Sequence, residues 1–191
     1  MKRRLFALAL ALLLAVSLPV SALAATWYLE DGDITIRATE NGQYVSQGDK
    51  HDVKDDDPTI SQNDSSTSTS NTITIDAEKD ATANVTLDGV NIVIDNTWEH
   101  QGTAGIRTTG EGNVTIELDG ENSVKSAVRA AGLQKENGGN LTIKDNNATA
   151  GKLKATGGIG GAGIGGGAGD KYAAVDGDGD VTISGGTITA T

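Results

Sequence analysis

Three aspartates alternate with glycines in Asp176-Gly177-Asp178-Gly179-Asp180, an arrangement that could hold a cation. Carboxylate oxygens separated by flexible glycines can converge on one hard ion, and calcium prefers such ligands. The run lacks the glycine and the bidentate glutamate of an EF-hand loop. We therefore predict that Asp176, Asp178 and Asp180 bind calcium, with an ordinary solvated turn as the alternative. A second acidic run, Asp55-Asp56-Asp57, is a further candidate.

Aromatic side chains are the second group that could do chemistry, because sugar rings stack on flat aromatic faces beside hydrogen-bonding groups. Trp98 is the leading candidate, since it lies in the polar segment Asn96-Thr97-Trp98-Glu99-His100-Gln101. The alternative is that Trp98 covers the side of the core. Tyr44 and Tyr172 are further candidate sugar-binding residues. We expect Trp27 and Tyr28 to cap one end of the fold.

The N-terminus has the features of a secretory signal peptide. Three basic residues, Lys2 to Arg4, precede an apolar run from Leu5 to Val20, and Ala22-Leu23-Ala24 follows as a small-x-small cleavage site. This pattern predicts a signal peptide over residues 1–24 and a secreted protein at a bacterial cell surface, with an uncleaved membrane anchor as the alternative. The chain has no cysteine, so stability must come from packing, hydrogen bonds or bound metal.

The net charge narrows the range of partners. The 191 residues carry a formal charge of −11, and removal of the three basic residues of the signal peptide changes it to −14. Nucleic acids and anionic membranes bind basic surfaces. We therefore expect no nucleic-acid partner and no membrane insertion after signal cleavage, whereas calcium remains possible.

Short alternating runs of β-branched residues predict strands separated by turns. The runs are 33–36, 72–75, 85–87, 92–94, 114–116, 141–143, 181–183 and 187–189. No amphipathic helix is predicted, and the polar segment Ser61 to Asn71 is expected to be a solvated loop. The chain is therefore expected to be an all-β protein.

The strands belong to a repeat. Ala104-Gly105-Ile106 recurs as Ala131-Gly132-Leu133 after 27 residues and as Ala162-Gly163-Ile164 after 31 more. Each period contains three strand-like pieces, and the last one carries a nine-residue insertion that includes Tyr172. Periods of this length indicate a solenoid. We predict a parallel β-helix with three strands per coil, in which 114–116, 141–143 and 181–183 stack.

The glycine-rich segment 157–170, with glycine at nine of 14 positions, fits this repeat. Glycine allows a positive φ at a bend and close approach of neighbouring coils. A flexible linker is disfavoured because Ile159 and Ile164 are expected at core positions. Residues 158–163 match the dinucleotide-binding pattern G-x-G-x-x-G, but no helix follows to hold a pyrophosphate.

A set of segments resembles the repeats of secreted, right-handed β-helix carbohydrate-binding domain proteins of Gram-positive, clostridial-type bacteria. They are WYLEDGDITI, NVTLDGVNIVID, GNVTIEL, AGLQKENGGNLTIK, GGAGIGGG and GDVTISGGTITAT. The resemblance implies a pectin-lyase-like fold that binds glycans at the cell surface, in some relatives with calcium and acidic plant polysaccharide. We expect an N-terminal strand and cap region at 25–70 and β-helix repeats at 71–191, truncated at the C-terminus in mid-repeat.

Catalysis on such a fold needs carboxylates clustered with basic groups on one face. The repeat instead aligns Glu117 with Lys144 and Asp119 with Asn146, and neither His51 nor His100 has a catalytic context. His100 is expected in an exposed loop. We predict a non-catalytic protein that binds an acidic or neutral plant or cell-wall polysaccharide. The alternatives are a structural spacer or adhesin stalk, and a pectin-lyase-like degrading enzyme.

Overall fold

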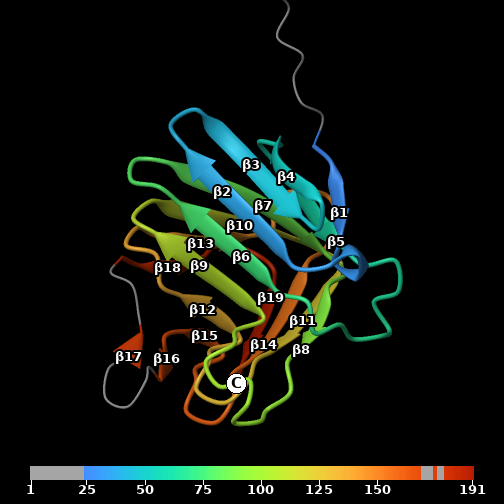
Figure 1. Cartoon of the computed structure of the whole chain (residues 1–191), viewed down its shortest axis with the longest axis vertical. Coiled ribbons are helices and arrows are strands. Elements are labelled where there is room, and N and C mark those ends of the chain that lie inside the picture. The colour runs from blue at the N-terminus through green and yellow to red at the C-terminus, as the bar shows by residue number, and fades with distance from the viewer. Residues whose placement is uncertain (1–23, 169–173, 176–178) are drawn as a thin grey trace, which may run out of the picture.

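The computed structural model describes residues 24–168, 174–175 and 179–191. Its strands stack in parallel as a β-solenoid of about five turns, as the repeat predicts (Figure 1). From Ile73 onward, each coil contributes one strand to each of three sheets, called A, B and C, in the chain order B, A, C. The only helix among the described residues is the 3-10 turn η1 (Leu29–Asp31).

Sheets A and C consist entirely of parallel pairs. Sheet A holds β1 (Thr26–Tyr28), β5 (Thr59–Ser61), β7 (Thr82–Asp88), β10 (Asn113–Asp119), β13 (Leu141–Lys144) and β18 (Val181–Ile183). Sheet C holds β8 (Asn91–Val93), β11 (Glu121–Lys125), β14 (Lys152–Thr156) and β19 (Thr187–Ala190). The predicted stacking of 114–116, 141–143 and 181–183 is confirmed, because β13 pairs with both β10 and β18 in register.

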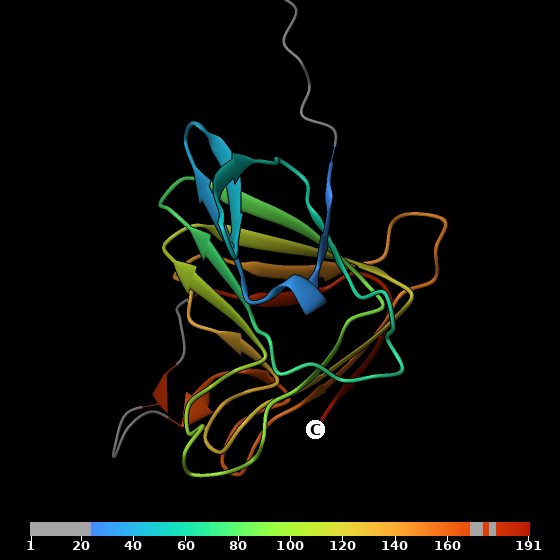
Figure 2. The same ribbon diagram turned by 45° about the vertical axis from the view of Figure 1, so that its right-hand side comes forward.

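Sheet B is parallel from β15 to β2 and antiparallel at its N-terminal end. It holds β2 (Ile34–Thr39), β3 (Gly42–Gln47), β4 (Lys50–Lys54), β6 (Ile73–Ala77), β9 (Ile106–Gly110), β12 (Leu133–Lys135) and β15 (Ile164–Gly165). The meander β2–β3–β4 ends the solenoid there, as Figure 2 shows from the side. All five residues of β4 are exposed and three are Lys or Asp, which discourages pairing with another chain.

The core consists of aliphatic columns, because equivalent residues of successive coils lie about 4.8 Å apart. One column in sheet B runs through Ile34, Ile73, Ile106, Leu133 and Ile164. The first four side chains are at most 1% exposed, and Ile164 is partly buried against them. The columns explain why a core can form with 3% aromatic residues.

Trp27 covers the core beside the N-terminal end of sheet A, as expected, and is only 4% exposed. Its indole Nε1 donates a 2.9 Å hydrogen bond to the Asp55 carboxylate, which is itself buried. Tyr28, by contrast, is 37% exposed, so Trp27 alone of this pair caps the core. Asp55 is therefore a structural residue here.

The glycine-rich segment lies where the coil turns from sheet C to sheet B. A Cβ built on Gly158 would lie 1.8 Å from the Ala127 carbonyl oxygen of the preceding coil, and one on Gly161 would lie 2.0 Å from that of Ala130. The expected close approach of coils is thus confirmed. The expectation that Ile159 is a core residue is wrong. It is 70% exposed, because it lies in the turn on the outside of this corner.

The insertion in the last coil contains a short antiparallel pair, β16 (Gly167–Ala168) with β17 (Ala174–Val175). Tyr172 falls in this insertion, outside the described residues. Most of the predicted signal peptide also lies outside them, and its cleavage stays a prediction. No helix among the described residues is long and apolar enough to cross a membrane.

Candidate functional site

Three loops stack at the corner between sheets C and B, and Trp98 lies on the first of them. These loops, which follow β8, β11 and β14, gather at the bottom of Figure 1. Backbone hydrogen bonds tie them together: Gly102 N–H donates to Val128 O at 2.9 Å, and Arg129 N–H to Ile159 O at 2.9 Å. Trp98 is therefore presented on a corner anchored to the solenoid.

Trp98 is 67% exposed, so the alternative that it covers the core is wrong. The guanidinium carbon of Arg129 lies 5.4 Å from the centroid of its ring, which is cation–π distance. Nearby, His100 is exposed and its Nδ1 lies 3.1 Å from the Thr97 hydroxyl, as expected of a loop histidine. The corner thus holds an aromatic face, a cation and polar groups together.

Arg129 was not identified from the sequence, although the repeat contains a signal for it. Its φ is +66°, and Gly102 and Gly160, 27 residues before and 31 residues after it, have φ of +83°. These intervals are the two repeat periods. Arginine therefore occupies a left-handed position for which the neighbouring coils use glycine, and such strain persists mainly where a side chain has a role.

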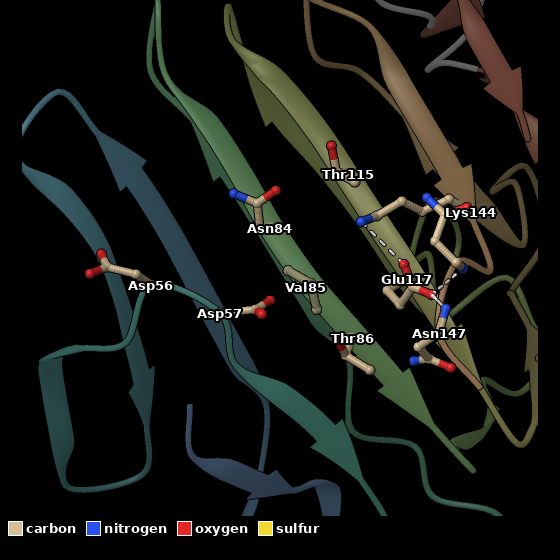
Figure 3. A pocket seen from close by; sticks show the side chains of 10 residues that line it. Asp56, Asp57, Asn84, Val85, Thr86, Thr115, Glu117, Lys144 and Asn147 are labelled. Carbon is tan, nitrogen blue, oxygen red and sulfur yellow. Dashed lines mark hydrogen bonds and ion pairs between the residues drawn. The ribbon is translucent and has the colours of Figure 1, made fainter. Parts of the chain in front are cut away.

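A groove of about 520 Å³ runs over the outer face of sheet A (Figure 3). Side chains from β7, β10 and β13 line it with Asp56 and Asp57, which precede β5. Its polar lining residues are Asp56, Asp57, Asn84, Thr86, Thr115, Glu117, Lys144, Asn146 and Asn147. The groove is therefore polar and carries more carboxylates than cations.

Glu117 is the most enclosed carboxylate of this groove, with 12% of its side chain exposed. Its Oε2 lies 3.2 Å from Lys144 Nζ, and its Oε1 accepts bonds from the backbone N–H groups of Asn146 at 2.6 Å and Asn147 at 3.2 Å. Burial works against ionisation, but these bonds and the Lys144 charge outweigh it and lower the pKa of Glu117. Glu117 is thus held as a carboxylate.

The residues in register with Glu117 on the two neighbouring strands are not carboxylates, whereas Asp119 lies two residues further along β10 on the same face. In register with Glu117 stand Thr86 on β7 and Lys144 on β13, so the alignment predicted from the repeat is confirmed. Asp57 lies on the other side of Val85 from Glu117 (Figure 3). General acid catalysis needs a carboxyl whose pKa is raised, and that of Glu117 is lowered.

Tyr44 lies on β3, apart from the Trp98 corner. It borders a depression of about 730 Å³ on the sheet B side, together with Arg37, Asp76 and Glu78. The Arg37 guanidinium carbon lies 5.9 Å from the Tyr44 ring centroid, and the Tyr44 hydroxyl lies 3.5 Å from Asn41 O. The structure does not bring Tyr44 and Trp98 into one site.

The predicted calcium site falls largely outside the described residues. Asp176 and Asp178 are not described, and Asp180 is exposed with its N–H donating to Asn140 Oδ1 at 3.0 Å. Calcium binding by these aspartates stays a prediction. Within the part of the chain that is described, no cluster of three or more His, Cys, Asp or Glu residues could hold a metal ion.

Comparisons with known proteins do not add a function to this geometry. Neither the protein-family models, nor the curated proteins, nor the solved structures give a match to this chain. The family resemblance therefore stays an expectation, and the functional argument rests on the residues and their arrangement.

Proposed function

We propose that this protein is a non-catalytic polysaccharide-binding protein of the bacterial cell surface, with the Trp98 corner as a sugar-binding platform. The observation that carries the proposal is the 67% exposure of Trp98 on a corner tied by hydrogen bonds to the next coil. Burying the apolar surface of an exposed indole is favourable by about 2 kcal/mol for an area of roughly 100 Å². A stacked sugar ring would recover it.

Arg129 supports the proposal because it fixes the ring. A guanidinium 5.4 Å from the ring centroid restricts the rotamers of Trp98, so less side-chain entropy is lost when a sugar binds. The surrounding Thr97, His100 and Gln101 supply polar groups for sugar hydroxyls. An aromatic face with a polar rim is the usual composition of a carbohydrate site.

The state of Glu117 favours binding over catalysis. A carboxylate with a lowered pKa and an ammonium partner is a poor proton donor, and its register neighbours are Thr86 and Lys144. The spacer or adhesin stalk and the degrading enzyme remain the alternatives that an experiment must separate from binding.

The experiment is retention of the purified chain on a panel of insoluble plant and cell-wall polysaccharides, with analysis of any released sugars. We expect retention without cleavage, and a loss of about 10- to 30-fold in affinity for Trp98→Ala, equivalent to about 2 kcal/mol. Tyr28→Ala is the matched control, because Tyr28 is an exposed aromatic on β1 of sheet A and not on the corner between sheets C and B. It should bind like the wild type.

Two outcomes would replace the proposal. Unsaturated or reducing-end products would establish an enzyme. A folded chain that is retained by no polysaccharide of the panel would favour the spacer, whose repeats need no ligand.

A further inference from the structure

We infer that the outer face of sheet C binds an acidic polysaccharide by contacting the carboxylate groups of the polymer, and that the bound polymer extends onto the Trp98 corner. This inference rests on the proposed function and specifies the charge of the ligand and the face that binds it.

The outer face of sheet C carries more basic than acidic residues, with three lysines and one carboxylate on its four strands. Lys125 ends β11, and Lys152 and Lys154 lie on β14; all three are exposed, and they alternate with buried residues that face the core. The single carboxylate on these two strands, Glu121, pairs with Lys152 at 2.6 Å. Among the described residues, neither Lys125 nor Lys154 has an ion-pair partner.

The groove on sheet A contrasts with this face. Three carboxylates, Asp56, Asp57 and Glu117, face one lysine in the groove on sheet A, and the whole chain carries −11. A polyanion is repelled by such surfaces and attracted by the sheet C face, because local potential rather than net charge governs where a charged ligand binds. The net charge had argued against nucleic acids and anionic membranes as partners, while an acidic or a neutral polysaccharide was expected.

The register of the strands brings the lysines into one patch. Glu121 stands opposite Lys152, Ser123 opposite Lys154, and Lys125 opposite Thr156. Neighbouring strands lie about 4.8 Å apart, and residues on one face of a strand about 6.6 Å apart. The ammonium groups of Lys125 and Lys154 can therefore reach carboxylates on one extended polymer.

Hydroxyl and amide groups surround the lysines, which is the reason to infer a polysaccharide. A groove of about 320 Å³ on this face is lined by Lys152, its ion-pair partner Glu121 and Lys154, together with Asn91, Ser123, Thr187 and Thr189. Such side chains donate and accept hydrogen bonds, as sugar hydroxyls require. Nucleic acids and polyphosphates carry the same charge with fewer hydroxyls, so they are the alternative that the test must separate.

The chain leads directly from this patch to the Trp98 corner. Arg129 follows Lys125 by four residues, in the loop that leaves β11, and contacts the Trp98 ring. A bound chain would thus lie across Lys154 and Lys125 and reach the guanidinium and the indole. Stacking and charge would then act on the same ligand.

The test compares polygalacturonate with its methyl-esterified form, which has the same sugar backbone without the charges. We expect the full chain to bind polygalacturonate more tightly, with an affinity that falls as salt rises. The double variant Lys125→Gln/Lys154→Gln should lose about tenfold in affinity for polygalacturonate and flatten the salt dependence. Its affinity for the esterified form should not change.

The control is Lys54→Gln/Lys79→Gln, which removes the same charge from the end of β4 and from the turn after β6 and should bind like the wild type. Equal binding of both polymers, or an unchanged affinity of the sheet C variant, overturns the inference while the proposed function stands. Tighter binding of single-stranded DNA or polyphosphate than of polygalacturonate also overturns it. Binding of neither polymer, with retention on other polysaccharides, overturns the inference alone; no retention on any polysaccharide overturns both.

Discussion

Arg129 places its guanidinium 5.4 Å from the centroid of the Trp98 ring, and it does so from a left-handed backbone conformation with φ of +66°. The coils on either side have glycine at this position. The protein therefore has a strained residue in contact with the more exposed of its two tryptophans.

In urea denaturation, Arg129→Gly should have an unfolding free energy about 1 kcal/mol larger than Arg129→Ala, because alanine keeps the left-handed strain and glycine removes it. Both variants lose the guanidinium and should bind polysaccharide more weakly than the wild type. Equal unfolding free energies of the two variants would show that the backbone is not strained at this position.

Ile143→Asp should destabilise the protein severely, by about 4 kcal/mol or more. Ile143 is fully buried between Ile116 and Ile183 in a sheet A column, so the carboxylate would have no partner. Thr142→Asp is the control, because Thr142 faces outward, and it should change the unfolding free energy by no more than about 1 kcal/mol. Urea denaturation followed by circular dichroism measures both, and equal effects would contradict the inward column.

Gly158→Ala should cost about 3 kcal/mol or more, since the new methyl group would lie 1.8 Å from the Ala127 carbonyl oxygen. The matched substitution is Gly160→Ala, whose Cβ would meet only the Ala168 Cβ at 3.6 Å. That change should cost about 1 kcal/mol, from the positive φ alone. Thermal unfolding of both variants checks the order, and a reversed order would mean that the coils are not in close contact.

Acid should remove a stabilisation that Glu117 provides at neutral pH. Its pKa is lowered from the ordinary value of 4.5, so the carboxylate stabilises the fold above that value and the effect disappears as pH falls through the folded-state pKa. Glu117→Gln should cost about 1–2 kcal/mol at pH 7 and progressively less below pH 4.5.

Urea titrations across this pH range measure the difference between the wild type and Glu117→Gln. Lys144→Gln leaves the Asn146 and Asn147 N–H donors in place. Its unfolding free energy should therefore differ from that of the wild type by an amount that depends less on pH than the difference for Glu117→Gln. A gap between wild type and Glu117→Gln that stays constant with pH would show that the carboxylate is not preferentially ionised in the folded state.

Much of the fold was predictable because each coil repeats the same local pattern. Val114, Leu141 and Val181 occupy one alternating position in three strands, and the 27-residue period aligns Glu117 with Lys144. The orientation of Ile159 was not predictable in this way. An apolar residue in a glycine-rich turn can face either way, and here the path of the corner exposes it.

The sequence by itself determined the all-β class, the stacking of the strands and the candidate role of Trp98, because alternation and repeat period depend only on local spacing. Only the tertiary structure decided that Arg129 lies against Trp98, that Glu117 is held by the next coil, and that Lys125 and Lys154 share an outer face. These contacts join residues of different coils. Their identity depends on the path of each corner and on side-chain direction, which residue spacing alone does not specify.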